Sequence, residues 1–312
     1  MQNYTLRKVF VLTLALVFIA GLFLIFSFKG ENDDQQKHRG GPESNFTVNP
    51  PAIPDQIEFA GEAAPLDLFY VRESFERELL INTYWHSSTI LLLKRANRWF
   101  PVIEPILNEN NIPDDFKYLA LIESGFIPIV SPKGAAGFWQ FLDKTGKEYG
   151  LEINDYVDER YNVEKATEAA CRYFQDSFDE YGSWTLVAAA YNAGKRRITE
   201  SLEQQKTNSY YELYLNDETS RYIYRIMAIK TICNAPENYS FYLDENDLYQ
   251  PLQLEKKEIN QPIESLVDFA QQNNISYKML KELNPWLRNR SLPYSSGKTY
   301  WISLPKDRQK TK

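Results

Sequence analysis

The chain has 312 residues, which is long enough for one sizeable hydrophobic core and a smaller additional module. Its formal net charge is −7 and it has no long basic run, so the sequence argues against nucleic acid as a partner. The only histidines are His38 and His86 and the only cysteines are Cys171 and Cys233, which disfavours a zinc site and a Cys-His nucleophile pair.

The N-terminus carries an apolar run that predicts a membrane anchor. Val9–Phe28 is a stretch of twenty uncharged residues rich in Leu, Phe, Val and Ile, and a helix of that length spans about 30 Å, one hydrocarbon thickness. Neither a lipid-attachment cysteine nor a small-residue cleavage site follows it, which favours a retained anchor over a cleaved signal peptide. Arg7 and Lys8 favour a cytoplasmic N-terminus, so we expect residues 1–29 to anchor the remaining chain outside the membrane.

Residues 30–60 are polar and contain Pro and Gly, which is typical of a flexible linker. From 61 to 248 the pattern is helical and predicts the main domain. Helices are expected at Leu66–Tyr84, Ser88–Arg98, a segment starting at Pro101, a segment opened by Pro113, Thr145–Tyr149, Val163–Glu180, Ser183–Tyr191 and Ser220–Ala235.

The character of the sequence changes near Pro251. Two predicted strands, "LEKKEI" (254–259) and "TYWISLP" (299–305), flank two helix-like segments, "ESLVDFAQQNN" and "YKMLKELNP". This β-α-α-β outline predicts a small module over residues 249–306, followed by a polar tail at 307–312. The sequence has no internal repeat of either unit.

A single glutamate lies in the apolar stretch "ALIESGF" (120–126), where a predicted helix ends. Apolar residues at Phe116, Leu119 and Ala120 place Glu123 on the face that this helix should bury. Burial and the negative end of the helix dipole would both raise its pKa, and a carboxyl group protonated near neutral pH suits a general acid. The alternative is a structural glutamate that reaches solvent or pairs with a nearby Lys or Arg.

The remaining residue types narrow the chemistry further. A Ser-His-Asp triad would have to use His86, whose position after Trp85 on a predicted helix favours a packed or half-exposed imidazole. No glycine-rich phosphate loop is present. If the chain is an enzyme, we expect it to work without metal or cofactor, with carboxylates, tyrosines and amides as the reacting and binding groups. Cys171 and Cys233 lie on patterns typical of helix interiors and should be free thiols.

Four segments in chain order carry a family resemblance: "IESGF" (122–126), "SPKGAAGFWQF" (131–141), "AAAYNAG" (188–194) and "ETSRYIYRI" (218–226). With their connectors "TGKEYGL", "DERYNVEKATEAA" and "YGSW", they resemble the lysozyme-like (SLT) lytic transglycosylases, most closely the membrane-bound D type. The resemblance covers about residues 65–235 and implies a mainly α, lysozyme-like catalytic domain of the goose type.

The resemblance also implies roles for individual residues. Glu123 matches the family's only catalytic carboxylate, and the matching substrate-binding residues are Ser131, Gln140, Tyr191, Asn192, Glu218 and Tyr222. Gly134 and Gly137 would let the backbone approach the sugar, although ordinary turn glycines would look the same. The alternatives are a turn residue for Ser131, a polar surface group for Gln140 and a buried core tyrosine for Tyr191. "LNDET" departs from the family's Leu-Pro-x-Glu-Thr, which weakens the match at Glu218 and Tyr222.

The mechanism implied by the resemblance needs one protein carboxylate, whereas ordinary glycosidases need two. Asp143, Asp155 and Asp158 lie near in sequence, and their simplest interpretation is a solvated loop or helix cap. In the family the substrate's N-acetyl group and C6 hydroxyl replace the second carboxylate, and the product carries a 1,6-anhydro-N-acetylmuramic acid end.

The C-terminal outline, with "LKELNPWL" (280–287) and "SGKTYWISLP" (296–305), resembles a degenerate LysM glycan-binding module. "NQPIE" and "YSSGK" replace two of the usual turns, so retained glycan affinity is open. The sequence thus predicts a monomeric, membrane-anchored lytic transglycosylase of the bacterial periplasm that acts on peptidoglycan strands. The alternatives are a muramidase on the same fold and a non-catalytic peptidoglycan-binding scaffold.

Overall fold

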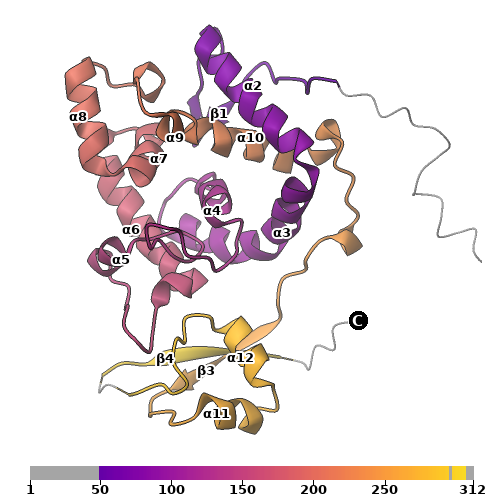
Figure 1. Cartoon of the computed structure of the whole chain (residues 1–312), viewed down its shortest axis with the longest axis vertical. Helices are drawn as coiled ribbons and strands as arrows, with labels where there is room; N and C mark the ends of the chain where they lie inside the picture. Colours follow the sequence, from indigo (N-terminus) through magenta and orange to yellow (C-terminus); the bar gives the residue numbers. More distant parts are fainter. Residues whose placement is uncertain (1–48, 295–296, 307–312) are drawn as a thin grey trace, which may run out of the picture. The chain divides into compact units, whose positions relative to one another are not determined.

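The computed structural model describes residues 49–294 and 297–306 (Figure 1). The predicted anchor Val9–Phe28 and the polar tail lie outside these residues. Within the part described, no helix is both long and apolar enough to span a bilayer.

The described chain is mainly helical, which confirms the predicted fold class at this level. Its helices are α2 (Phe69–Tyr84), α3 (His86–Glu109), α4 (Phe116–Ser124), α5 (Asp143–Glu148), α6 (Val163–Tyr181), α7 (Trp184–Ala193), α8 (Lys195–Gln205), α9 (Asp217–Ser220), α10 (Tyr222–Asn234), α11 (Leu266–Gln272) and α12 (Tyr277–Leu283). Short 3₁₀ turns are η1 (Glu159–Tyr161), η2 (Tyr210–Glu212), η3 (Pro236–Tyr239) and η4 (Glu245–Asp247).

Helix α4 is the centre of the larger hydrophobic core. Six consecutive residues, Phe116–Leu121, are buried, so the helix has no solvent face over most of its length. It packs against α3 and α10, and Figure 1 shows it enclosed by the longer helices. A short apolar helix of this kind depends on its neighbours for stability, and its end is held where those neighbours place it.

Helix α3 runs without a break through Pro101 and Pro105. The sequence predicted two helices here with a new start at Pro101, and that prediction is wrong. A proline inside a helix removes one backbone hydrogen bond and costs about 3 kcal/mol. The buried face formed by Leu93, Ala96 and Ile103 continues across the proline, and its packing on α4 and α6 outweighs that cost.

A hairpin of two short strands, β1 (Glu58–Phe59) and β2 (Glu62–Ala63), precedes α2. Phe59 is fully buried, so the folded chain includes residues that the sequence assigned to the linker. The Glu62 carboxylate accepts hydrogen bonds from the backbone N–H groups of Trp184 (2.5 Å) and Thr185 (3.0 Å) at the start of α7. Lys230 on α10 pairs with Glu58 in the hairpin. The hairpin is therefore bound to two helices that come much later in the chain.

The C-terminal module has the predicted β-α-α-β order. Strands β3 (Leu254–Ile259) and β4 (Tyr300–Pro305) pair antiparallel with Ile259 opposite Tyr300, and α11 and α12 lie between them in the chain. The fully buried Asn284 ends α12: its side chain donates to Ser303 O (2.8 Å) and accepts from Ser303 N–H (2.7 Å). Asn284, from the "LNP" segment at 283–285, thus connects the end of α12 to β4 through its side chain.

Candidate active site

Glu123 is the penultimate residue of α4, as the sequence predicted. The helix ends at Gly125, which has a left-handed φ of 57° and so favours glycine. Glu123 is half-buried at this end. The chain turns immediately afterwards, so the carboxyl group lies at the junction of the core and the loops that follow.

Three charged or polar groups surround the Glu123 carboxyl. Burial is the main influence and raises its pKa above the ordinary 4.5, and Glu218 raises it further. The hydrogen bond that Tyr222 donates to Glu123 Oε1 and the charge of Arg225 act in the opposite direction. The net shift is upward, so burial outweighs both, and the protonated form persists to higher pH than in an exposed glutamate.

The structure places the Tyr222 ring in the core, with its hydroxyl against Glu123. The resemblance implied a residue that binds substrate beyond the scission point, but the ring is buried with 1% exposure. Its hydroxyl is a hydrogen-bond donor to Glu123, and burial beside that carboxyl raises the tyrosine pKa well above 10.0. Tyr222 therefore holds and orients the Glu123 carboxyl from the protein side.

The active-site loop (residues 131–141) follows α4 and is closed on itself by isolated bridges that join Ala136 to Val130 and Phe141. Ser131 Oγ accepts from Ala135 N–H at 3.0 Å, which favours the turn interpretation for its side chain. Gln140 has a left-handed φ of 50°, and its amide donates to Gly137 O at 2.8 Å. Both predicted residues therefore make contacts that shape the loop.

Several hydrogen bonds fix the middle of this loop to the helices, and two of them come from residues of the predicted motifs. Ser124, next to Glu123 and buried, donates to Phe138 O at 2.9 Å. Tyr191 on α7 donates to Trp139 O at 2.5 Å. The loop is thus attached on one side to the helix that carries the glutamate and on the other to the tyrosine motif. The serine that follows the glutamate thus has a structural role that the sequence alone did not indicate.

Tyr191 and Asn192 end α7, whose Ala188–Ala190 are fully buried. Tyr191 is half-buried, and burial together with the nearby Glu123 raises its pKa well above 10.0. Asn192 accepts from Thr219 Oγ1 at 2.9 Å and has its amide 3.5 Å from Glu218 Oε1. The third and fourth motifs of the sequence therefore meet at this point.

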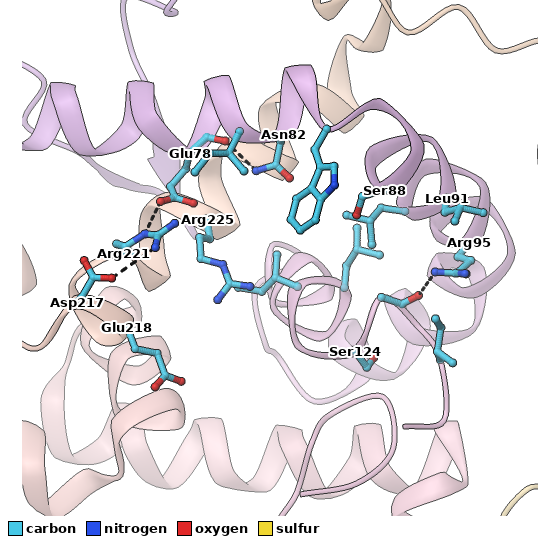
Figure 2. A pocket seen from close by; sticks show the side chains of 17 residues that line it. Glu78, Asn82, Ser88, Leu91, Arg95, Ser124, Asp217, Glu218, Arg221 and Arg225 are labelled. Carbon is cyan, nitrogen blue, oxygen red and sulfur yellow. Dashed lines mark hydrogen bonds and ion pairs between the residues drawn. The ribbon is translucent and has the colours of Figure 1, made fainter. Parts of the chain in front are cut away.

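A cavity of about 570 Å³ lies beside the end of α4, which is within the range of small-molecule sites (Figure 2). Glu123 itself does not line it, but its charged neighbours Arg225 and Glu218 do, as do Ser124 and Gly125. The exposed Trp85 indole lies on the same wall as Asn82 and Ser88 from the α2–α3 junction. The cavity thus presents an aromatic face and polar groups beside the glutamate.

The remaining charges of the cavity are mostly paired. The nearly buried Glu78 accepts from Arg221 Nε at 2.6 Å, and Arg221 also lies 3.5 Å from Asp217 (Figure 2). Arg225 makes no ion pair or side-chain hydrogen bond with any residue that the structure describes. Arg225 was not among the site residues predicted from the sequence. Its signal was the spacing from Tyr222, because residues three apart share a helix face.

None of the three aspartates considered as a second carboxylate contacts Glu123 in the described chain. Both oxygens of Asp158 bind Arg160, at 2.9 and 2.7 Å. Asp143 pairs with Lys147 at 2.9 Å, and Asp155 is exposed. Their interpretation as loop and cap residues is consistent with these contacts.

Comparisons with known proteins identify two domains in this chain. Residues 101–214 match the transglycosylase SLT domain, and residues 255–308 match the soluble lytic transglycosylase C-terminal LysM-like domain. Three of the four motifs fall within the first match, and 218–226 lies beyond its end.

Curated relatives extend the match. The chain is 29% identical over 244 residues to membrane-bound lytic murein transglycosylase D of Escherichia coli strain K12, covering 76% of this chain and 52% of that protein. The protein of the same name from Escherichia coli O6:H1 gives the same values. The chain thus spans about half the length of these relatives. These matches confirm the resemblance inferred from the motifs: the chain carries a transglycosylase SLT domain followed by a LysM-like domain, and it is similar to membrane-bound lytic murein transglycosylase D.

Proposed function

We propose that the chain is a peptidoglycan lytic transglycosylase that cleaves the β-1,4 bond between N-acetylmuramic acid and N-acetylglucosamine. The observation that carries the proposal is the environment of Glu123, a half-buried carboxyl with a raised pKa that accepts a hydrogen bond from Tyr222 and adjoins a cavity. The SLT domain and the similarity to lytic murein transglycosylase D support it.

Glu123 acts in this proposal first as an acid and then as a base. The protonated carboxyl gives its proton to the glycosidic oxygen as the bond to C1 of the muramic sugar breaks. The N-acetyl oxygen of that sugar then bonds to C1 and neutralises the cationic centre. The Glu123 carboxylate removes the C6 hydroxyl proton, O6 replaces the N-acetyl oxygen at C1, and the 1,6-anhydro ring closes. Neither water nor a metal ion takes part in these steps.

The other predicted residues have supporting roles in the proposal. Tyr222 orients the carboxyl, while Tyr191 and Gln140 hold the loop that faces the reacting sugar. Asn192 and Glu218 bind the glycan beside the scission point, and Ser131 shapes the loop.

We further propose the organisation expected from the sequence. Residues 1–29 anchor the protein in the membrane, a linker connects this anchor to a catalytic domain that begins with the hairpin at 58–63 rather than at 61 and ends at 248, and 249–306 form the LysM-like module. The enzyme is then a periplasmic monomer whose partner is the glycan strand.

Product analysis tests the proposed reaction. Purified sacculi digested with the full-length protein should yield muropeptides with 1,6-anhydro ends, which are one water lighter by mass spectrometry than reducing-end products. Reducing ends alone would identify a muramidase. Bound protein without released products would identify a non-catalytic scaffold.

A further inference from the structure

The linking segment (residues 152–161), which connects α5 to α6, lies against the C-terminal module. Val157 forms an antiparallel bridge with Leu287, and both side chains are buried. The Asp158 N–H donates to Trp286 O at 2.9 Å, and the Arg288 N–H donates to Tyr156 O at 2.8 Å. The module is therefore joined to the helical part by backbone pairing as well as by side chains.

Side chains extend this interface on both sides of the bridge. Ala136, Val157 and Tyr161 belong to the same buried hydrophobic cluster as the core of the module. The Arg288 guanidinium lies 4.4 Å from the centre of the Tyr161 ring. Tyr300 on β4 donates to Glu152 at 3.1 Å, where Lys298 also pairs with that carboxylate at 2.9 Å. An apolar centre with a polar margin is typical of a specific interface.

The linking segment also holds the active-site loop. Arg160 donates from Nη1 to Gly134 O at 2.9 Å and to Phe141 O at 3.2 Å, near the two ends of that loop. Its other nitrogens bind Asp158, and both side chains are about one-tenth exposed. A Cβ on Gly137 would lie 1.8 Å from Arg160 O, so the loop and the segment are in direct backbone contact.

These contacts form a continuous series from the module to the catalytic glutamate. The module binds the backbone of Asp158, the Asp158 carboxylate fixes Arg160, and Arg160 binds the loop. The loop is in turn hydrogen-bonded to Ser124, the neighbour of Glu123. Ala136 of the loop is itself fully buried in the shared cluster.

We propose that the C-terminal module supports the active-site loop, with Asp158 and Arg160 as positioning residues for the reaction. The inference rests on the proposed function and adds to it a role for the module that does not depend on glycan binding. Displacement of reacting groups by about 1 Å can cost roughly a hundredfold in rate. Loosening the interface should therefore slow turnover on every substrate, whether or not that substrate reaches the module.

The principal test is Arg160→Lys in the full-length protein. Lysine keeps the charge but cannot reach two carbonyls and a carboxylate at once. We expect kcat to fall by about tenfold to a hundredfold and by the same factor on sacculi and on short soluble glycans, with KM on the short glycans nearly unchanged. An unchanged kcat on short glycans, measured well below the melting temperature, would overturn the proposal whatever happens to stability.

A milder variant covers the case in which Arg160→Lys does not fold. The double variant Tyr300→Phe with Arg288→Ala weakens the interface from the module side and leaves every residue of the loop in place. It should slow turnover of both substrates in parallel. A loss confined to sacculi would mean that the module acts by docking on glycan, and the proposal would be wrong.

Trp301→Ala is the matched control. Trp301 follows Tyr300 on β4, half-exposed, and its side chain points to the opposite face of the strand. Its replacement should leave turnover of short glycans unchanged. If it slows that turnover as much as the interface variants do, the effect is a general one on the module and the proposal fails.

Hydrogen exchange separates this inference from the proposed activity. Backbone amides of the loop, such as Ser131, which donates to Ala135 O at 2.8 Å, should exchange faster in the interface variants than in the wild type and the Trp301→Ala control. Unchanged exchange would overturn the support role. This readout holds even if sacculi release no product, an outcome that would refute the proposed reaction alone.

Discussion

The Tyr222 hydroxyl donates a hydrogen bond to Glu123 Oε1 across a sequence separation of 99 residues. The tyrosine begins α10 and the glutamate lies in the last turn of α4, and these two helices pack against each other in the core. The carboxyl group is therefore oriented by a group that is itself held by packing. A phenol so buried stays protonated at any working pH, so it remains a donor in both protonation states of the glutamate.

Glu123→Gln should abolish most turnover while the protein still folds. The amide keeps the shape and the hydrogen bond from Tyr222 but cannot give up a proton to the leaving oxygen. General acid catalysis is typically worth about 10²–10⁴-fold, so we expect a loss at least of that order. The measurement is the rate of product release from sacculi at matched protein concentration. A variant that retains more than about a tenth of the rate would show that another group is the acid.

The same variant should change the pH dependence of stability. The folded-state pKa of Glu123 is above 4.5, so between 4.5 and the raised value the folded protein binds more protons than the unfolded chain. The contribution of this group to the free energy of unfolding is then fully present below 4.5 and is lost as the pH rises through the folded pKa.

Glutamine has no such titration, so the stability of Glu123→Gln relative to the wild type should increase with pH across that window. Denaturant unfolding of both proteins, from below pH 4.5 to neutrality, gives the difference. A difference that stays constant over the series contradicts the raised pKa.

Arg225→Gln and Glu218→Gln should shift the activity profile in opposite directions. The Arg225 charge lowers the Glu123 pKa and the Glu218 charge raises it. Because the acid form of Glu123 is required, activity falls as pH rises through this pKa. The alkaline limb of kcat/KM should move up in Arg225→Gln and down in Glu218→Gln, whatever each change does to the maximum rate. Shifts of the same sign in both variants would show that a different group controls this limb.

Tyr191→Phe should lower turnover with little effect on the melting temperature. The substitution keeps the ring among Phe141, Tyr173 and Phe174 and removes only the hydroxyl that binds Trp139 O. The loop then loses one of its hydrogen-bonded attachments to the helices. Thermal unfolding monitored alongside kinetics decides the matter, since a large fall in melting temperature with normal turnover below it would favour the core-tyrosine interpretation.

Cys171 and Cys233 are free, as the sequence predicted, and both should resist alkylation in the folded protein. Burial raises the pKa of each thiol to about 12, so the reactive thiolate is scarce near neutral pH. Brief treatment with iodoacetamide should leave the native mass unchanged and add two labels after unfolding. A mass two hydrogens lighter before reduction would instead reveal a disulfide.

Features that depend on residues close together in the chain could be predicted from the sequence. The position of Glu123 at the end of a helix, on its buried face, was predicted from apolar spacing, and α4 does end one residue after it. The prediction at Pro101 was wrong, because the packing that keeps α3 continuous involves α4 and α6 and is not encoded at the proline itself. The partners of Glu123 were also out of reach, since hydrogen bonds between distant segments leave no period in the sequence.

The active-site loop also combines a feature that the sequence predicted with contacts that it did not predict. Gly137 was expected to permit a close backbone approach or a turn, and it does lie where a side chain would not fit. Gly137 contacts the backbone of Arg160. Arg160 lies in the connector "DERYNVEKATEAA", for which no role in the site was predicted. Ser124 and Arg160 support the loop through hydrogen bonds to its carbonyl groups. Serine and arginine are common polar residues, so their role could be recognised only from the structure, which shows the acceptors.

Because the chain is synthesised from its N-terminus, the hairpin at 58–63 is made long before the helices that it contacts. Lys230 and Glu58 are 172 residues apart, and Glu62 binds backbone groups 122 and 123 residues downstream. A chain that emerges from its N-terminus first therefore presents this acidic hairpin long before α7 and α10 exist to receive it. The domain can close only after nearly all of its helices are available, which makes its assembly a late and concerted event in synthesis rather than a stepwise one.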